Sequence, residues 1–136
     1  MIIGKAGEFI AQKYLEEEGY FVLEKNYRTR YGEIDIIARK SSNLIFAEVK
    51  TRTSLEYGHP LEAVNRLKVS KIKKVASLYI TSNRLSEYNP SFNIISIIIG
   101  RSFIEEIAIK ENTLLQEITS CGALKNSKKI KIEHIE

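Results

Sequence analysis

Two short stretches decide the fold of this chain: Glu33-Ile34-Asp35-Ile36-Ile37-Ala38 and Leu44-Ile45-Phe46-Ala47-Glu48-Val49-Lys50. Both are rich in the β-branched and aromatic residues that favour strands. The segment between them contains Lys40-Ser41-Ser42-Asn43, which has the polar composition of a turn. The sequence therefore predicts a β-hairpin.

The turn also sets the register that we expect for this hairpin. A turn centred on residues 41–42 places Asp35 opposite Glu48 and Glu33 opposite Lys50. Directly opposed side chains project to the same face, so these four charged groups are expected to share one end of one face. The other face is wholly apolar and is expected to be buried. It comprises Ile34, Ile36, Ala38, Ile45, Ala47 and Val49.

Two opposed carboxylates repel each other unless a cation lies between them. Mg²⁺ prefers oxygen ligands and commonly takes one or two carboxylates plus water and substrate phosphate. Asp35 and Glu48 match that requirement, and Lys50 is close enough along its strand to orient a water or to stabilise charge on a phosphate. A purely structural interpretation also fits the pattern, with Glu48 exposed and Lys50 paired to Glu33.

The flanking segments predict an α/β fold with a mixed sheet. We expect a helix over 4–18, ended by Gly19, and a second helix from Pro60 to about Ser82. The remaining expected strands cover 20–28, 92–99 and 129–134, and the segment 103–109 fits either a strand or a helix.

Basic residues gather in the middle of the chain. Eight basic and two acidic residues lie from Lys50 to Arg84, a net charge of +6 that favours polyanions. A solvated helix face is the alternative. The candidate nucleic-acid contacts are Arg52, Arg66, Lys71, Lys73 and Lys74. Lys68 shares a helix face with Ile72 and Val75, so it either reaches the charged end of the hairpin or extends past the core to water.

Length and composition predict one domain over residues 1–136 in a reducing, cytoplasmic setting. The single cysteine, Cys121, has no partner for an internal disulfide. The longest apolar run, Ile94–Ile99, is too short to cross a bilayer, so no membrane partner is expected. His59 and His134 lack the neighbouring ligands of a zinc site.

Several motifs together resemble the YraN-like family of small predicted endonucleases, within the PD-(D/E)xK nuclease superfamily, which is similar to archaeal Holliday junction resolvases. The likeness is clearest over residues 4–99. It rests on Gly4-Lys5-Ala6-Gly7-Glu8, Asn26-Tyr27-Arg28, Gly32 to Ala38, Phe46 to Arg52, Gly58, Pro60 and Glu62-Ala63-Val64 with Lys68.

The resemblance implies a restriction-endonuclease-like fold whose catalytic hairpin is flanked by helices. It implies that Asp35 and Glu48 bind Mg²⁺, for which Mn²⁺ substitutes, and that Lys50 is the catalytic lysine. It matches Glu8 to an acidic position near the metal, although a first-turn glutamate also suits the helix dipole. A resolvase-like role would use DNA and a two-fold homodimer.

The chain departs from the family pattern in two places. Ser91 and Asn93 stand where an Arg-Phe-Asp motif is usual. Residues 101–129 look like an insertion before a closing strand at 130–136.

Three functions remain open on the sequence. The first is a metal-dependent endonuclease acting on DNA, including branched or damaged DNA. The second is a nucleic-acid-binding module on a nuclease fold without turnover. The third is a protein-interaction adaptor whose charged strand end is structural. For the nuclease, Glu8, Glu33 and Lys68 are the possible additional site residues.

Overall fold

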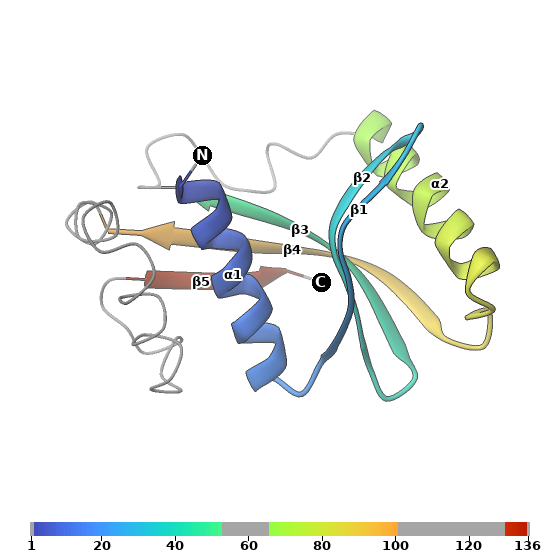
Figure 1. The fold of residues 1–136 in the computed structure, drawn as a ribbon, viewed down its shortest axis with the longest axis horizontal. Helices are drawn as coiled ribbons and strands as arrows, with labels where there is room; N and C mark the ends of the chain where they lie inside the picture. The colour runs from blue at the N-terminus through green and yellow to red at the C-terminus, as the bar shows by residue number, and fades with distance from the viewer. Residues whose placement is uncertain (1, 53–65, 101–129, 136) are drawn as a thin grey trace.

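The computed structural model describes residues 2–52, 66–100 and 130–135. In these ranges the elements follow the order α1 (Ile2–Glu17), β1 (Phe21–Thr29), β2 (Gly32–Lys40), β3 (Asn43–Arg52), α2 (Arg66–Ser82), β4 (Asn89–Ile99) and β5 (Ile130–Ile135). The strands form one five-stranded sheet in the order β1-β2-β3-β4-β5 (Figure 1). Only β3 and β4 pair in parallel, so the sheet is mixed as predicted.

The two helices cover opposite faces of the sheet. Ile45 and Ala47 pack in a cluster with α1, whereas Leu44 and Phe46 pack in a second cluster with α2. Because alternate residues of a strand face opposite sides, each helix has its own core. The residues that α1 buries are Ala6, Ile10, Ala11, Tyr14 and Leu15, and α2 buries Val75 and Tyr79. This arrangement confirms the predicted α/β fold.

The register of the β2–β3 hairpin is the predicted one. Lys40 pairs with Asn43, and Ile37 pairs with Phe46. Regular pairing ends at Ile36 and Ala47, one residue before the expected Asp35–Glu48 pair. The two strands therefore stop forming a ladder at the point where the charged residues begin.

The prediction for Ile34 was wrong. It was expected on the same face as Ile36, but it packs with Ile37 and Phe46 in the α2 cluster. The strict alternation of a strand holds only where pairing is regular, and Ile34 lies beyond the last β2–β3 pair. Ile34 instead pairs with Tyr27 of β1 and follows that strand.

The predicted closing strand is present as β5, which pairs antiparallel with β4. His134 ties this strand to the α1 face. Its Nε2 lies 2.7 Å from Oδ1 of the buried Asn93, and its Nδ1 lies 3.1 Å from the Tyr14 hydroxyl. A neutral imidazole protonated on Nε2 satisfies both contacts, with Asn93 as the acceptor that fixes the orientation of the His134 ring.

Some predictions fall outside the described residues: the start of the second helix at Pro60, the segment 103–109, the insertion at 101–129, Cys121 and His59. The second helix is seen from Arg66 onward. No helix in the described ranges is long and apolar enough to cross a membrane.

Gly7 fixes the distance between α1 and the sheet. A Cβ at this position would lie 2.8 Å from Cβ of Thr51 on β3 and would also collide with its hydroxyl. Only a residue without a side chain allows this approach. The next residue, Glu8, is thereby carried toward the charged end of the hairpin.

We expect Gly7→Ala to lower the free energy of unfolding by about 1–3 kcal/mol, because α1 must move away from Thr51. The matched control is Gly4→Ala on the same helix, where nothing lies within 4 Å of the added carbon. That change should be neutral or stabilising by up to about 1 kcal/mol. Urea unfolding of both variants makes the comparison, and equal stabilities would contradict the close approach of α1 to Thr51.

Candidate functional site

Asp35 lies where the hairpin strands separate. Its Oδ2 accepts a hydrogen bond of 2.8 Å from the backbone N–H of Val49 on β3. The carboxylate thus occupies the space between the strands that a main-chain carbonyl would fill in a regular ladder. One of its oxygens is used in this way, which fixes the orientation of the carboxyl group.

The surroundings of Asp35 oppose its negative charge. Burial raises the pKa of Asp35 above its ordinary value of 3.8, and the Val49 N–H lowers it by a smaller amount. The charges of Glu8, Glu48 and Glu33 raise the pKa further. A carboxylate in this position is stabilised by a bound cation.

Glu48 of β3 is held by two lysines. Its Oε1 lies 3.2 Å from the ammonium of Lys50 and also forms an ion pair with Lys68 of α2. Its Oε2 is buried and has no hydrogen-bond partner among the described residues. Because a buried carboxylate oxygen without a partner is costly, this atom is available for a ligand.

The sequence left open whether Lys68 reaches the charged end of the hairpin or extends past the core to water, and its ion pair with Glu48 shows the first arrangement. Burial alone lowers the pKa of Lys68, but hydrogen bonding to Glu48 and the charges of Glu48 and Asp35 bring it above its ordinary value of 10.5. The side chain reaches the charged end of the hairpin. Lys50 contacts Glu48 and not Glu33, whose carboxylate lies 3.4 Å from the guanidinium of Arg28.

Asn26 joins the acidic groups and was not among the predicted site residues. It lies across from Asp35 in the β1–β2 register and has a φ of 54°. With its amide turned to suit its neighbours, Nδ2 donates to Glu8 and to Glu33 at 3.2 Å each. An asparagine inside an expected strand was the available signal, since asparagine is depleted in strands but tolerates positive φ.

A pocket of about 40 Å³ lies between these side chains. Its polar lining consists of Glu33, Asp35, Glu48 and Lys68, and its apolar wall includes Phe46 and Phe92. Within the described ranges no three His, Cys, Asp or Glu side chains converge to make a metal cage. Two carboxylates with a free oxygen on Glu48 do fit Mg²⁺, which usually completes its shell with water and phosphate.

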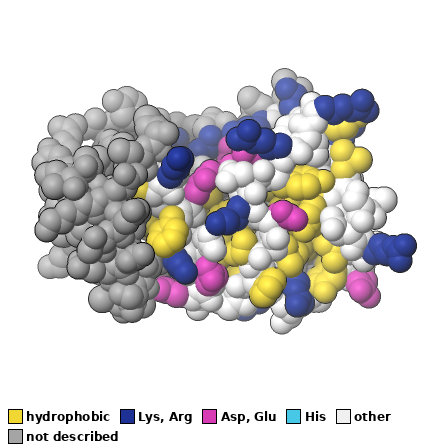
Figure 2. All heavy atoms as spheres, in the orientation of Figure 1, with side chains coloured by type: hydrophobic (Ala, Val, Ile, Leu, Met, Phe, Trp, Pro, Cys, Tyr) yellow, Lys and Arg dark blue, Asp and Glu magenta, His cyan; other side chains and the backbone are white. Residues whose placement is uncertain are grey.

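The predicted nucleic-acid contacts do not form one surface. Lys71, Lys73 and Lys74 are exposed on α2, but Lys73 follows Lys71 by about 200° around the helix and faces away from it. Arg52 is half-buried on β3. Arg66 starts the described part of α2, and its side chain is outside what the structure describes. Lys and Arg side chains gather along the upper edge of the view in Figure 2, where the β1–β2 turn meets α2.

The negative charge of Asp35 should lower the free energy of unfolding at neutral pH in the absence of metal. Its raised pKa means that the folded state disfavours the charged form, so the penalty appears as the pH rises through that pKa and is absent at low pH. We expect Asp35→Asn to keep the Val49 contact and to raise the melting temperature at pH 7. The gain should vanish as the pH falls below the ordinary value of 3.8.

Asp35→Ala is the matched comparison, because it removes the same charge but leaves the Val49 N–H without its acceptor. It should be less stable than Asp35→Asn by about 1–3 kcal/mol. Thermal and urea unfolding in EDTA measure both. Equal stability of the two variants would mean that the hydrogen bond contributes nothing.

The family match covers the chain from α1 into β4. The model of the "Uncharacterised protein family UPF0102" matches residues 7–97. A UPF0102 protein of Caldanaerobacter subterraneus is 47% identical over 95 residues, covering 70% of this chain and 78% of that protein. A UPF0102 protein of Alkaliphilus metalliredigens is 48% identical over 99 residues, covering 73% and 87%. The chain therefore belongs to the uncharacterised protein family UPF0102.

Proposed function

We propose that this protein is a Mg²⁺-dependent endonuclease of the restriction-endonuclease-like fold that hydrolyses phosphodiester bonds in DNA. The observation that carries the proposal is the pocket at the open end of the hairpin. There Asp35 and Glu48 present carboxylates, Glu48 keeps one buried oxygen without a partner in the described ranges, and Lys50 lies beside them. The resemblance of the same residues to the PD-(D/E)xK nucleases supports it.

Asp35 and Glu48 would hold the metal, with Mn²⁺ able to replace Mg²⁺. When bound, the ion would lower the pKa of a coordinated water and offset charge on the scissile phosphate. Val49 keeps the Asp35 carboxyl group in one orientation through its 2.8 Å hydrogen bond. A carboxylate held in this way loses little entropy when a ligand binds.

Lys50 is suited to the charge that develops on the phosphate. Its side chain is 26% exposed and its ammonium lies 3.2 Å from Glu48, so it is both desolvated in part and fixed in place. A pre-positioned cation stabilises a transition state without reorganising. Lys68 gives Glu48 a second positive partner, which holds that side chain at the pocket.

The test is cleavage of labelled linear, single-stranded, flapped and four-way-junction DNA with Mg²⁺, Mn²⁺ or EDTA. We expect metal-dependent cleavage by the wild-type protein. Asp35→Asn and Glu48→Gln should lose both metal binding and cleavage, because each removes a charged ligand. Lys50→Ala should keep metal binding, measured by calorimetry, and lose about 100-fold or more in rate.

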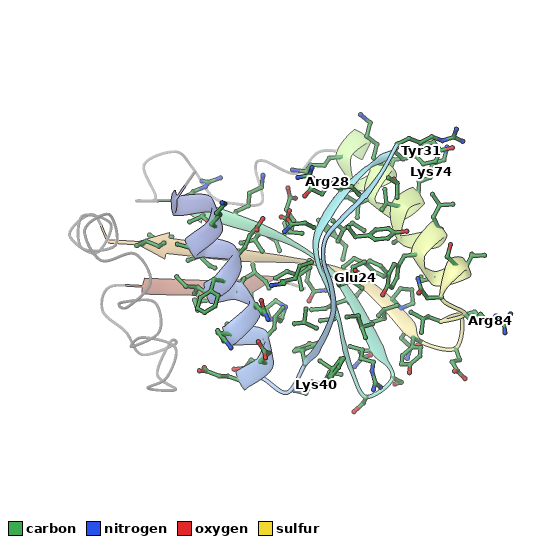
Figure 3. The ribbon with its side chains drawn as sticks, in the orientation of Figure 1. Glu24, Arg28, Tyr31, Lys40, Lys74 and Arg84 are labelled. Carbon is green, nitrogen blue, oxygen red and sulfur yellow. The ribbon has the colours of Figure 1, made fainter. Side chains whose placement is uncertain are left out.

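Arg84→Ala is the control, since Arg84 is exposed at the far end of α2 from the β1–β2 turn (Figure 3). It should cleave at the wild-type rate. Cleavage that continues in EDTA, or that survives the Asp35 and Glu48 changes in folded protein, would overturn the proposal. Binding of DNA without any cleavage would favour the non-catalytic module.

A further inference from the structure

A second pocket adjoins the candidate metal site. It has a volume of about 200 Å³ and lies between the β1–β2 turn and α2. Glu33, Lys68 and Ile72 line both pockets, so the two are adjacent. The far end of the second pocket is lined by Tyr31 and Gly32 of the turn and by Lys71 of α2. We call this second pocket the turn groove.

The geometry of the turn keeps the groove open. Gly32 has a φ of 151°, which is available to glycine but not to other residues without strain. The absence of a side chain there also leaves space beside Val75, whose Cγ2 would lie 3.8 Å from an added Cβ. The turn therefore approaches α2 without filling the gap between them.

Two cations lie against the aromatic ring of Tyr31 at the mouth of the groove, and a third lines the groove. The ammonium of Lys74 lies 4.1 Å from the Tyr31 ring centroid, and the Arg30 guanidinium carbon lies 4.8 Å from it. Arg30 also donates a hydrogen bond of 2.6 Å to the Tyr31 hydroxyl. Lys71 lines the same pocket. Tyr31 and Lys74 lie side by side where β1, β2 and α2 meet (Figure 3).

These cations lack acidic partners within the described part of the chain. Among the described residues, Arg30, Lys71 and Lys74 form no ion pair. The acidic residue that lines the groove, Glu33, is paired with Arg28. The like charges of these three side chains at one groove repel each other. A polyanion with planar groups would relieve that repulsion and could stack on the aromatic surface.

We propose that the turn groove binds an unpaired segment of nucleic acid next to the scissile phosphate, with a base against Tyr31 and phosphates at Lys71 and Lys74. A pocket of about 200 Å³ has room for a base or a sugar–phosphate, and the ring of Tyr31 in its lining is a surface on which an unpaired base can stack. The substrate class is therefore DNA with a single-stranded portion, such as a flap or a gap. This inference rests on the proposed nuclease site, because the groove shares Glu33, Lys68 and Ile72 with that pocket.

The first experiment measures binding in EDTA, so that it does not depend on cleavage. A fluorescein-labelled single strand and the corresponding duplex are titrated by anisotropy at several salt concentrations. Wild-type protein should bind the single strand more tightly. Lys71→Ala combined with Lys74→Ala should weaken that binding about tenfold or more and reduce the salt slope by about 0.7 for each phosphate that is no longer neutralised.

Tyr31→Ala should weaken single-strand binding by about fivefold or more and leave the salt slope unchanged, because a stacking contact carries no charge. Arg84→Ala is the control, since it removes a positive charge from an exposed position beyond the end of α2 that is far from the groove (Figure 3). It should bind within about twofold of wild type.

A fluorescent reporter tests the stacking contact directly. The chain has no tryptophan, so Tyr31→Trp introduces a single one. Single-stranded DNA should quench its emission. The control is Phe21→Trp. Phe21 is also exposed, at 63%, and it also has a cation near its ring, because the Arg39 guanidinium lies 5.8 Å from the ring centroid. Phe21 does not line the groove. Its emission should not change.

The outcomes separate the two proposals. Weaker binding by the groove variants together with absent cleavage by wild type would refute the nuclease and keep the groove. Cleavage by wild type with equal binding by Tyr31→Ala, the Lys71/Lys74 variant and Arg84→Ala would refute the groove and keep the nuclease. Tighter binding of the duplex than of the single strand would also overturn the groove proposal.

Discussion

The hydrogen bond from the Val49 N–H to the Asp35 carboxylate is the contact on which the arrangement of this site depends. It lies at the point where main-chain pairing between β2 and β3 ends. Up to that point the hairpin is an ordinary buried sheet. Beyond it, the strands present side-chain oxygens to each other, and a pocket forms in the space that a continued ladder would have closed.

The acidic side chains around this pocket come from separate elements and would repel one another without compensation. Glu8 belongs to α1, Asp35 to β2 and Glu48 to β3. Lys50 and Lys68 offset the charge of Glu48, and Asn26 donates to the acids on the other side. Such a cluster is poor for stability alone, and proteins keep clusters of this kind mainly where a ligand binds.

Local patterns allowed the hairpin and its register to be predicted, because a polar turn and a period of two specify which residues face each other. The same patterns could not place Ile34, since its orientation depends on where pairing stops. The sequence patterns also could not predict the ion pair between Lys68 and Glu48 or the ion pair between Arg28 and Glu33. Those contacts depend on how α2 and β1 pack on the hairpin, which is a tertiary property.

The pairing of β5 with β4 has a consequence for synthesis on the ribosome. β4 contains Ile94, Ile95, Ile97, Ile98 and Ile99 and pairs along its outer edge with residues 130–135. At about 5–20 residues per second, the growing chain spends a few seconds with this apolar strand edge unpaired. An open edge of this kind readily pairs with other chains. Ribosome stalling between these two strands would therefore favour aggregation or chaperone capture of the nascent protein.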